Sequence, residues 1–273
     1  MPALTDFAAR LKGDPAWRKQ YAQQLKQARR IARRMHLIHV SGNPDRVPFC
    51  RLLSSPPHEI PTSEEAAGYC SAHTRETEDN FGLPRSVYFY AGRAHYSFGK
   101  IALAFAADSE EGREGSATPF DTGGMYKRDL INVNLGDEEF QTLKEFVSAS
   151  TVTLAEWRKA FARYLAAYFA PPLSYTFGKP CRPDPEGMLL SNGDNWRAWV
   201  FEVRFHHQGH SLLKAVAWCA SVGQLALIRR ELKNNPANPA FRQFFKATHN
   251  ITPRGTENYC AETENWVRIE AFS

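Results

Sequence analysis

The sequence predicts an α+β fold, because strands and helices follow one another without the regular strand–helix–strand order of a parallel sheet. Apolar residues recur every three to four positions in residues 14–35 and 153–169, as in amphipathic helices. Short apolar runs at 36–40, 87–90 and 101–105 are bounded by polar residues, Gly or Pro, as strands are. With 273 residues, the chain is long enough to bury a sizeable core.

Composition narrows the class of protein. No apolar run approaches the ~20 residues that span a bilayer, so we predict no membrane segment. Residues 1–7 lack the basic and apolar regions of a secretory signal. The five cysteines are widely spaced and form no Cys-x-x-Cys pair. This pattern favours a reducing, cytoplasmic compartment over a disulfide framework.

The positive charge is concentrated near the N-terminus. Residues 10–34 hold nine Lys and Arg against one acidic residue, whereas residues 35–273 hold 25 basic and 27 acidic residues. The net charge of +5 is therefore a property of one segment. Such a strip favours a polyanionic partner, although a solvated helix face has the same composition.

The first predicted helix begins with Asp14 as the N-cap and Pro15 at the first helical position. Its apolar stripe consists of Trp17, Tyr21, Leu25, Ala28, Ala32 and Met35. The basic residues lie mostly on the other faces of the helix. We therefore expect residues 1–35 to form a basic helical segment packed on the core of a single domain, residues 36–273.

The predicted elements of that domain follow in order. The strand at 36–40 ends at a Ser-Gly-Asn-Pro sequence, and Thr62-x-x-Glu65 has the pattern of a capping box that opens a short helix. Helices at 137–148 and 153–169 form a helical insertion near 137–169. The remaining expected elements are strands at 87–90, 101–105, 125–135 and 196–205, a loop at 112–124, irregular chain at 170–185, a helix at 239–248 and a C-terminal strand. Residues 212–232 fit either a strand near 212–218 followed by a helix or one long helix.

Two carboxylates precede the C-terminal strand. Glu262 and Glu264 come directly before a run that includes Trp266, Val267 and Ile269. Carboxylates at the entrance of a strand suit chemistry that develops positive charge, such as cleavage of a glycosidic bond through an oxocarbenium-like transition state. An exposed strand entrance has the same composition, so this pair alone does not define a site.

Two earlier strands carry further candidates. His39 lies just before the Ser41-Gly42 turn, and three tyrosines surround an Ala-Gly-Arg sequence: Tyr88, Tyr90 and Tyr96. Taken singly, these residues also fit a histidine at the edge of a core and aromatic residues packed on a sheet.

Together, in this order, the three elements resemble the His-Tyr-Glu branch of the ADP-ribosyltransferase fold, the branch of diphtheria-toxin-like toxins and poly-ADP-ribose polymerases. Residues 37–42 resemble the first strand of that family, residues 87–96 its tyrosine strand, and residues 261–267 its closing glutamate strand. The resemblance spans about residues 36–272. It implies a split β-sheet core with flanking and inserted helices, and makes residues 36–273 the catalytic domain.

The resemblance implies NAD as the donor of ADP-ribose, and no metal. His39 would bind a ribose hydroxyl, Glu264 would stabilise the positive charge that develops as nicotinamide leaves, and Glu262 would orient or deprotonate the nucleophile. One tyrosine would stack on the nicotinamide ring, and an arginine would meet the pyrophosphate. The residues assigned to NAD are His39, Ser41, Tyr88, Tyr90, Tyr96 and Arg93.

The acceptor is expected to be a macromolecule. The basic N-terminal segment favours nucleic acid, RNA or single-stranded DNA, because Lys and Arg bind phosphates without reading sequence. The residues assigned to the acceptor are Arg254, Tyr259, Arg29, Arg30, Arg33 and Arg34. A protein side chain is the alternative acceptor, and a non-catalytic nucleic-acid-binding protein is a second alternative. By analogy with toxins and effectors, an antitoxin or immunity protein is an expected partner.

Two further motifs indicate other kinds of chemistry. Residues 120–124 contain Asp-Thr-Gly once, whereas aspartic proteases need two facing aspartates, so we interpret this segment as a turn that lines the site. His206, His207 and His210 would suit a hydrolase or nuclease that binds zinc. Gln208-Gly209 makes a helix at this position unfavourable, and no cysteine or carboxylate cluster adjoins it.

Overall fold

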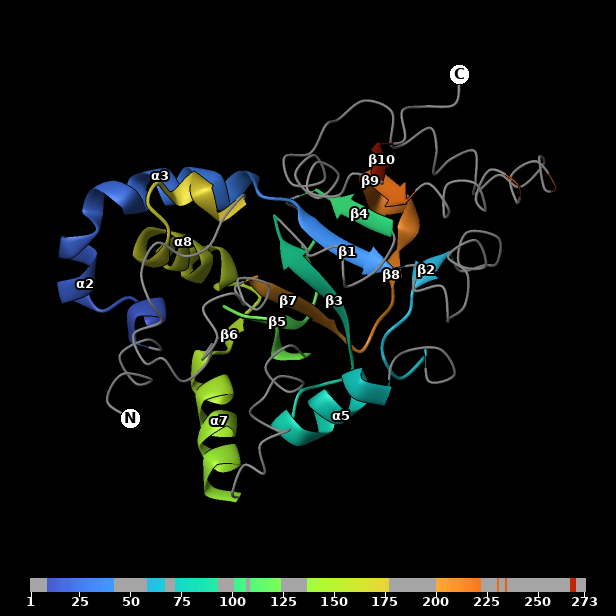
Figure 1. The fold of residues 1–273 in the computed structure, drawn as a ribbon, viewed down its shortest axis with the longest axis horizontal. Helices are drawn as coiled ribbons and strands as arrows, with labels where there is room; N and C mark the ends of the chain where they lie inside the picture. The colour runs from blue at the N-terminus through green and yellow to red at the C-terminus, as the bar shows by residue number, and fades with distance from the viewer. Residues whose placement is uncertain are drawn as a thin grey trace. The chain divides into compact units, whose positions relative to one another are not determined.

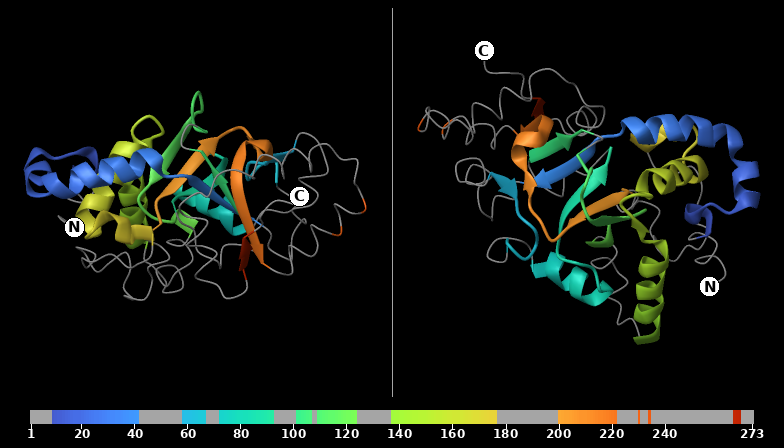
Figure 2. Two further views of the ribbon diagram at one scale, coloured as in Figure 1. Left: turned by 90° about the horizontal axis from the view of Figure 1, so that it is seen from above. Right: turned by 180° about the vertical axis from the view of Figure 1, so that it is seen from behind.

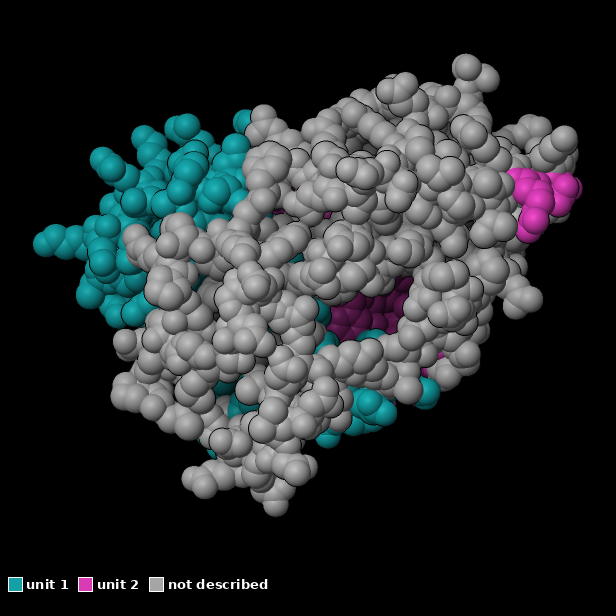
Figure 3. Space-filling view, in the orientation of Figure 1, with its two compact units in different colours: residues 1–34, 71–84, 114–204 teal, residues 35–70, 85–113, 205–273 magenta. Residues whose placement is uncertain are grey.

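The computed structural model describes residues 9–41, 58–66, 72–92, 101–106, 109–123, 137–176, 200–221, 230, 234 and 266–268. The chain divides into two compact units, each assembled from separate segments (Figure 3). Unit 1 comprises residues 1–34, 71–84 and 114–204, and unit 2 comprises residues 35–70, 85–113 and 205–273. No helix among the described residues combines the length and apolar character that a membrane span needs.

Unit 1 is built around helices. The amphipathic N-terminal stretch forms α2 (Pro15–Gln20) and α3 (Ala22–Arg34), and α3 packs on α8 (Trp157–Tyr168) and on the 3-10 helix η2 (Pro172–Thr176) (Figure 1). The Asp14 cap is confirmed, since the amide of Ala16 donates to Asp14 Oδ1 at 2.8 Å. All six residues of the predicted apolar stripe are buried.

The predicted first helix is nevertheless interrupted. Tyr21 has φ −113° and ψ 24°, outside the helical range, and separates α2 from α3. The apolar stripe continues across the break, because Trp17 and Tyr21 are both buried and their rings lie 5.4 Å apart. Hydrophobic periodicity thus predicted which residues are buried, but not the interruption.

The remaining elements of unit 1 are two helices and short strands. α5 (Ala72–Phe81) packs on α7 (Asp137–Ser150). β5 (Gly115–Thr118) pairs antiparallel with β6 (Val152–Thr153), and β7 (Glu202–His206) lies on the other side of β5 and continues into unit 2.

The aromatic core of unit 1 packs against α8. Trp157, Phe161 and Tyr164 project from this helix against Phe201, whose amide donates to the Tyr175 hydroxyl at 3.0 Å. All five side chains are fully buried. These contacts explain the aromatic residues of α8.

Unit 2 is an antiparallel sheet with the strand order β10-β9-β4-β1-β3 (Figure 2). Its strands are β1 (Leu37–Ser41), β3 (Ser86–Ala91), β4 (Ile101–Phe105), β9 (Ala215–Ser221) and β10 (Trp266–Arg268). A separate pair joins β2 (Glu59–Ile60) to β8 (His210–Ser211), and the 3-10 helix η4 (Leu212–Lys214) leads from β8 to β9. Helices together with antiparallel strands confirm the α+β class.

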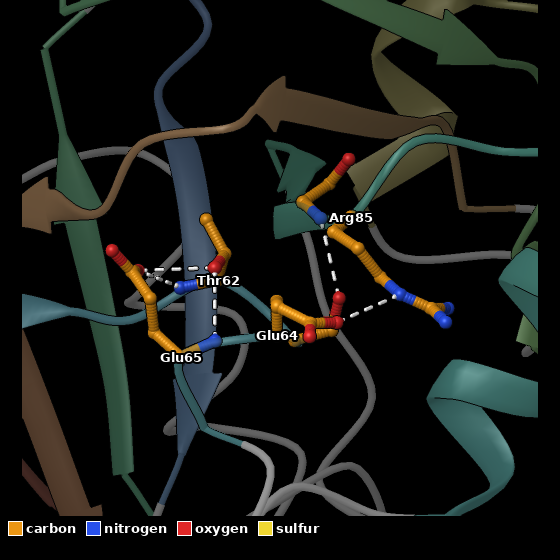
Figure 4. A network of polar contacts seen from close by, with 6 residues as sticks. Thr62, Glu64, Glu65 and Arg85 are labelled. Atoms are coloured by element: carbon orange, nitrogen blue, oxygen red, sulfur yellow. Dashed lines mark hydrogen bonds and ion pairs between the residues drawn. The ribbon is translucent and has the colours of Figure 1, made fainter.

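The Thr62–Glu65 prediction is confirmed in its hydrogen bonds. The amide of Thr62 donates to Glu65 Oε2 at 2.8 Å, and the amide of Glu65 donates to Thr62 Oγ1 at 3.3 Å (Figure 4). Arg85 and Glu64 form an ion pair beside it at 3.2 Å (Figure 4). The described residues 63–66 form a turn, so the bonds predicted for a capping box here close a turn.

Several boundaries predicted from the sequence are wrong. Residues 112–124 were expected to form a loop, but they contain β5, a strand of small buried residues without polar–apolar alternation. The helix expected at 153 begins at Trp157, because Thr153 pairs with Ser116 in β6. Residues 212–221 take the first of the two alternatives, a strand, preceded by η4. The strand expected at 196–205 corresponds to β7 at 202–206, and residues 200 and 201 lie outside that strand.

Other predicted elements lie outside the described residues. These are the strand at 125–135, residues 177–185 of the irregular segment and the helix at 239–248.

Candidate functional site

His39 lies within β1, between β3 and β4 of unit 2. Its Nδ1 lies 2.8 Å from the carbonyl oxygen of Tyr88 on β3. A carbonyl oxygen only accepts hydrogen bonds, so Nδ1 carries the proton. Burial lowers the pKa of His39 to about 4, against the opposing effect of the Tyr88 hydrogen bond. The imidazole is therefore neutral at physiological pH, and its Nε2 is a hydrogen-bond acceptor.

The register of the sheet decides which side chains accompany His39. Ile38 pairs with Tyr90, so His39 faces Phe89, and their rings lie 5.8 Å apart. Because successive residues of a strand point to opposite faces, Tyr88 and Tyr90 lie on the other face of the sheet from Phe89. The backbone of Tyr88 thus positions His39, but the rings of Tyr88 and Tyr90 do not share its face.

A second histidine, His210, is buried in contact with Phe89. His210 on β8 is fully buried, and its ring contacts the rings of Phe89, Phe105 and Phe205 at centroid distances of 5.3, 4.8 and 5.2 Å. Neither of its ring nitrogens has a hydrogen-bond partner among the described residues.

The environment of His210 opposes its protonation. Burial lowers the pKa of His210 to about 3, and the charges of Arg113, Lys214 and His39 act in the same direction. His206 ends β7 and His207 has φ 60°, so the histidines at 206, 207 and 210 lie on a strand connection, as the Gln-Gly sequence indicated, and not on one helix face.

The entrance of β10 is placed by the strand register. The row of paired residues across four strands of unit 2 is Val267, Ala220, Ile101 and Ser41. Since β10 runs antiparallel to β1, it begins at the end of the sheet where β1 ends. Three strand spacings separate the ends of this row, about 14 Å. Ser41 and the start of β10 therefore lie at the same end of the strands of the sheet.

Four of the arginines assigned to an acceptor lie on α3 in unit 1. Leu25, Ala28 and Ala32 form the buried side of α3, whereas the basic residues of its other faces are exposed: Lys26, Arg29, Arg30, Arg33 and Arg34. Neither α2 nor α3 contains an acidic residue. The C-terminal half of α3 thus presents four exposed guanidinium groups, and Lys26 precedes them.

A buried polar cluster in unit 1 was not predicted as a site. Glu202 accepts a hydrogen bond from Thr122 Oγ1 at 2.7 Å and lies 3.4 Å from Arg204 Nη1, and Arg204 Nε donates to Ser116 Oγ at 3.2 Å. Burial raises the pKa of Glu202 to about 8; Arg204 opposes this increase, Asp121 adds to it, and the Thr122 hydrogen bonds oppose it.

This cluster changes the interpretation of the Asp-Thr-Gly triplet. Asp121 and Thr122 are buried and contribute to the interior of unit 1. The one signal in the sequence was a pair of opposite charges, Glu202 and Arg204, two positions apart on a strand and hence on one face of it. A carboxyl group with a pKa of about 8 is protonated at neutral pH and can act as a hydrogen-bond donor.

The other predicted site residues lie outside the described residues: Glu262, Glu264, Arg93, Tyr96, Arg254 and Tyr259. For Ser41, only the backbone is described. No group of three or more potential metal ligands is present in the described part of the chain. A comparison with models of known protein families found no match, and comparisons with curated proteins and with solved structures found no significant match.

Proposed function

We propose that the chain is a mono-ADP-ribosyltransferase that transfers ADP-ribose from NAD to a nucleic acid, RNA or single-stranded DNA, and acts as a toxin or effector. The observation that carries the proposal is the state of His39. Its Nδ1–H is held by the Tyr88 carbonyl, and burial keeps the ring neutral. A neutral imidazole with a fixed tautomer offers Nε2 as an oriented acceptor for a ribose hydroxyl.

The direction of the strands supports the same assignment. β1 ends, and β10 begins, at the same end of the sheet of unit 2. Glu262 and Glu264 precede β10 in the sequence. In this proposal Glu264 stabilises the positive charge that develops as the nicotinamide bond breaks, which is typically worth ~10²–10³ in rate. Glu262 orients or deprotonates the nucleophile of the acceptor.

The sheet faces refine the choice of tyrosine. Tyr88 and Tyr90 lie on the opposite face from Phe89, which shares a face with His39. A ring that stacks on nicotinamide must reach the ligand that His39 binds. We therefore assign this role to Tyr96, and assign to Tyr88 the positioning of His39 through its backbone.

The acceptor assignment rests on α3. Its exposed arginines have no acidic neighbour within α2 or α3, and regularly spaced guanidinium groups suit the phosphates of a nucleic acid strand. Such contacts bind the backbone without reading the bases, so they define a class of acceptor and leave the modified atom to the active site.

The test is transfer of label from NAD. Wild type is incubated with adenine-labelled NAD and either RNA, single-stranded DNA or a cell lysate, and free nicotinamide is measured in parallel. We expect labelled nucleic acid with the wild type, and a loss of at least ~100-fold with Glu264→Gln and with His39→Ala. His207→Asn is the matched control, because His207 is exposed and Asn tolerates its positive φ.

Each alternative has its own result in this experiment. Label on lysate proteins with none on nucleic acid selects the protein acceptor. Binding of nucleic acid without any release of nicotinamide selects the non-catalytic alternative and rejects the transferase.

A further inference from the structure

Two arginines from two helices of unit 1 meet beside Gly13, and a third lies near them. A Cβ atom at residue 13 would lie 2.7 Å from Nη2 of Arg163 on α8 and 2.7 Å from Nη2 of Arg18 on α2. The two guanidinium groups therefore face the same point and lie within twice that distance of each other. Arg29 on α3 is close enough to act on the charge of Arg163. Sequence periodicity gave no indication of this cluster, because Arg163 lies more than 100 residues from the other two.

Local backbone structure holds Arg163 in place. The helical turn at residues 9–12 ends at Gly13, whose amide donates to the carbonyl of Ala9 at 2.9 Å and whose φ is +97°. Only glycine adopts this conformation without strain. Arg163 Nη1 donates to the carbonyl of Leu11 in the same turn. One end of the guanidinium is thereby anchored, and Nη2 is directed toward Arg18.

Among the described residues, one acidic residue, Glu156, opposes the positive charges around Arg163. Burial lowers the pKa of Arg163, and the charges of Arg18 and Arg29 lower it further, with Glu156 as the opposing charge. Arg18 and Arg29 make no side-chain hydrogen bond or ion pair with another described residue. Guanidinium groups gathered in this way repel one another unless an anion lies between them.

We propose that Arg18, Arg29 and Arg163 form a binding site for a backbone phosphate of single-stranded nucleic acid. This inference rests on the proposed function and deepens it, since it names where the acceptor strand is held. Guanidinium donors from different directions match the oxygens of a phosphate. Arg29 is followed on α3 by three further exposed arginines, Arg30, Arg33 and Arg34, within about 8 Å of helix. Several neighbouring guanidinium groups fit successive phosphates of a polymer better than one free anion.

The test measures binding of fluorescein-labelled oligouridine and oligothymidine by anisotropy, in the absence of NAD, over a series of KCl concentrations. The variants are Arg18→Gln, Arg163→Gln and the double variant. Lys144→Gln on α7 removes one positive charge elsewhere in unit 1 and is the control. Because Arg163 also contacts Leu11, thermal unfolding of each variant shows whether unit 1 is intact, and Arg18→Gln, at an exposed position, reports independently of that contact.

Each single variant should weaken binding about tenfold and reduce the slope of log K against log[salt] by about 0.7. Lys144→Gln should bind within about twofold of wild type. Wild-type affinity in both Arg18→Gln and Arg163→Gln overturns the site. Binding to vesicles that contain phosphatidylserine is measured in parallel. If the two variants lose binding to these vesicles while their oligonucleotide binding is unchanged, the phosphate site is also overturned.

The same variants separate the two proposals. If Arg18→Gln and Arg163→Gln still release nicotinamide from NAD but bind oligonucleotide poorly, both proposals hold. If wild type releases no nicotinamide but its oligonucleotide binding depends on these arginines, the phosphate site stands and the transferase fails.

Discussion

Glu202 gives unit 1 a pH-dependent stability that a single substitution can reveal. Burial raises its pKa from 4.5 to about 8. The folded state therefore holds this proton more tightly than the unfolded chain does. The stability contributed by Glu202 is present in full below pH 4.5 and declines as the pH rises toward about 8. Glu202→Gln keeps the shape of the side chain and an acceptor for Thr122, but it cannot ionise.

The size of the effect follows from the interval between the two pKa values. Between pH 6.5 and pH 8, each pH unit is worth about 1.4 kcal/mol. Wild type should therefore lose about 2 kcal/mol of unfolding free energy relative to Glu202→Gln across this interval. Taking the difference between the two proteins removes the titration of all other groups.

The assay is urea unfolding at pH values from about 6.5 to 8.5, followed by tryptophan fluorescence, to which the buried Trp17 and Trp157 of unit 1 contribute. Glu76→Gln on α5 serves as the control for removal of an exposed carboxylate. The reasoning is refuted if Glu202→Gln is destabilised by ~3–5 kcal/mol at every pH. That result would mean that an ionised Glu202 pairs with Arg204 and that its loss leaves a buried charge alone.

Three further predictions concern the framework. Gly115→Ala should destabilise unit 1 by about 3 kcal/mol or more, because the added Cβ would lie 2.2 Å from the carbonyl oxygen of Arg204. Gly82→Ala is the control: Gly82 has φ +67°, and an added Cβ would meet no atom within 4 Å. This variant should lose only about 1 kcal/mol in the same urea titration. Asp14→Ala should lose about 1 kcal/mol through the N-cap bond to Ala16, and equal stability of the two proteins would contradict that cap. Wild type should become less stable as the pH falls below 6.5, because burial lowers the pKa of His39 to about 4 and of His210 to about 3; His210→Met should reduce this loss by about 1.4 kcal/mol per pH unit, and an unchanged pH profile would show that His210 is not held neutral.

Periodicity predicted the helices and the strands with strong apolar character. The stripe of α2 and α3 and the aromatic face of α8 are buried as expected, and β4 has the predicted bounds, because burial of one face is a local property that the sequence records directly. β5 escaped prediction because its residues are small and buried, and what fixes them is the close approach of Gly115 to the backbone of Arg204. That contact depends on a residue far away in the chain.

The site divides in the same way. His39 and the exposed arginines of α3 could be named from the sequence, since strand position and charge pattern are local. The opposite faces of Phe89 and Tyr88 follow from strand register, which the sequence alone did not provide. Arg163 and the Glu202–Thr122 contact join residues far apart in the chain, so only the folded structure brings them together.

The imidazole of His39 offers the most direct measurement. In a ¹⁵N spectrum of histidine-labelled protein, we expect His39 to remain neutral from about pH 5.5 to 8, protonated on Nδ1. Addition of NAD should then shift the Nε2 resonance, with no such shift for His207. A His39 that titrates near its ordinary pKa of 6.5, or whose Nε2 resonance does not respond to saturating NAD, would contradict the assignment of this histidine to the ribose.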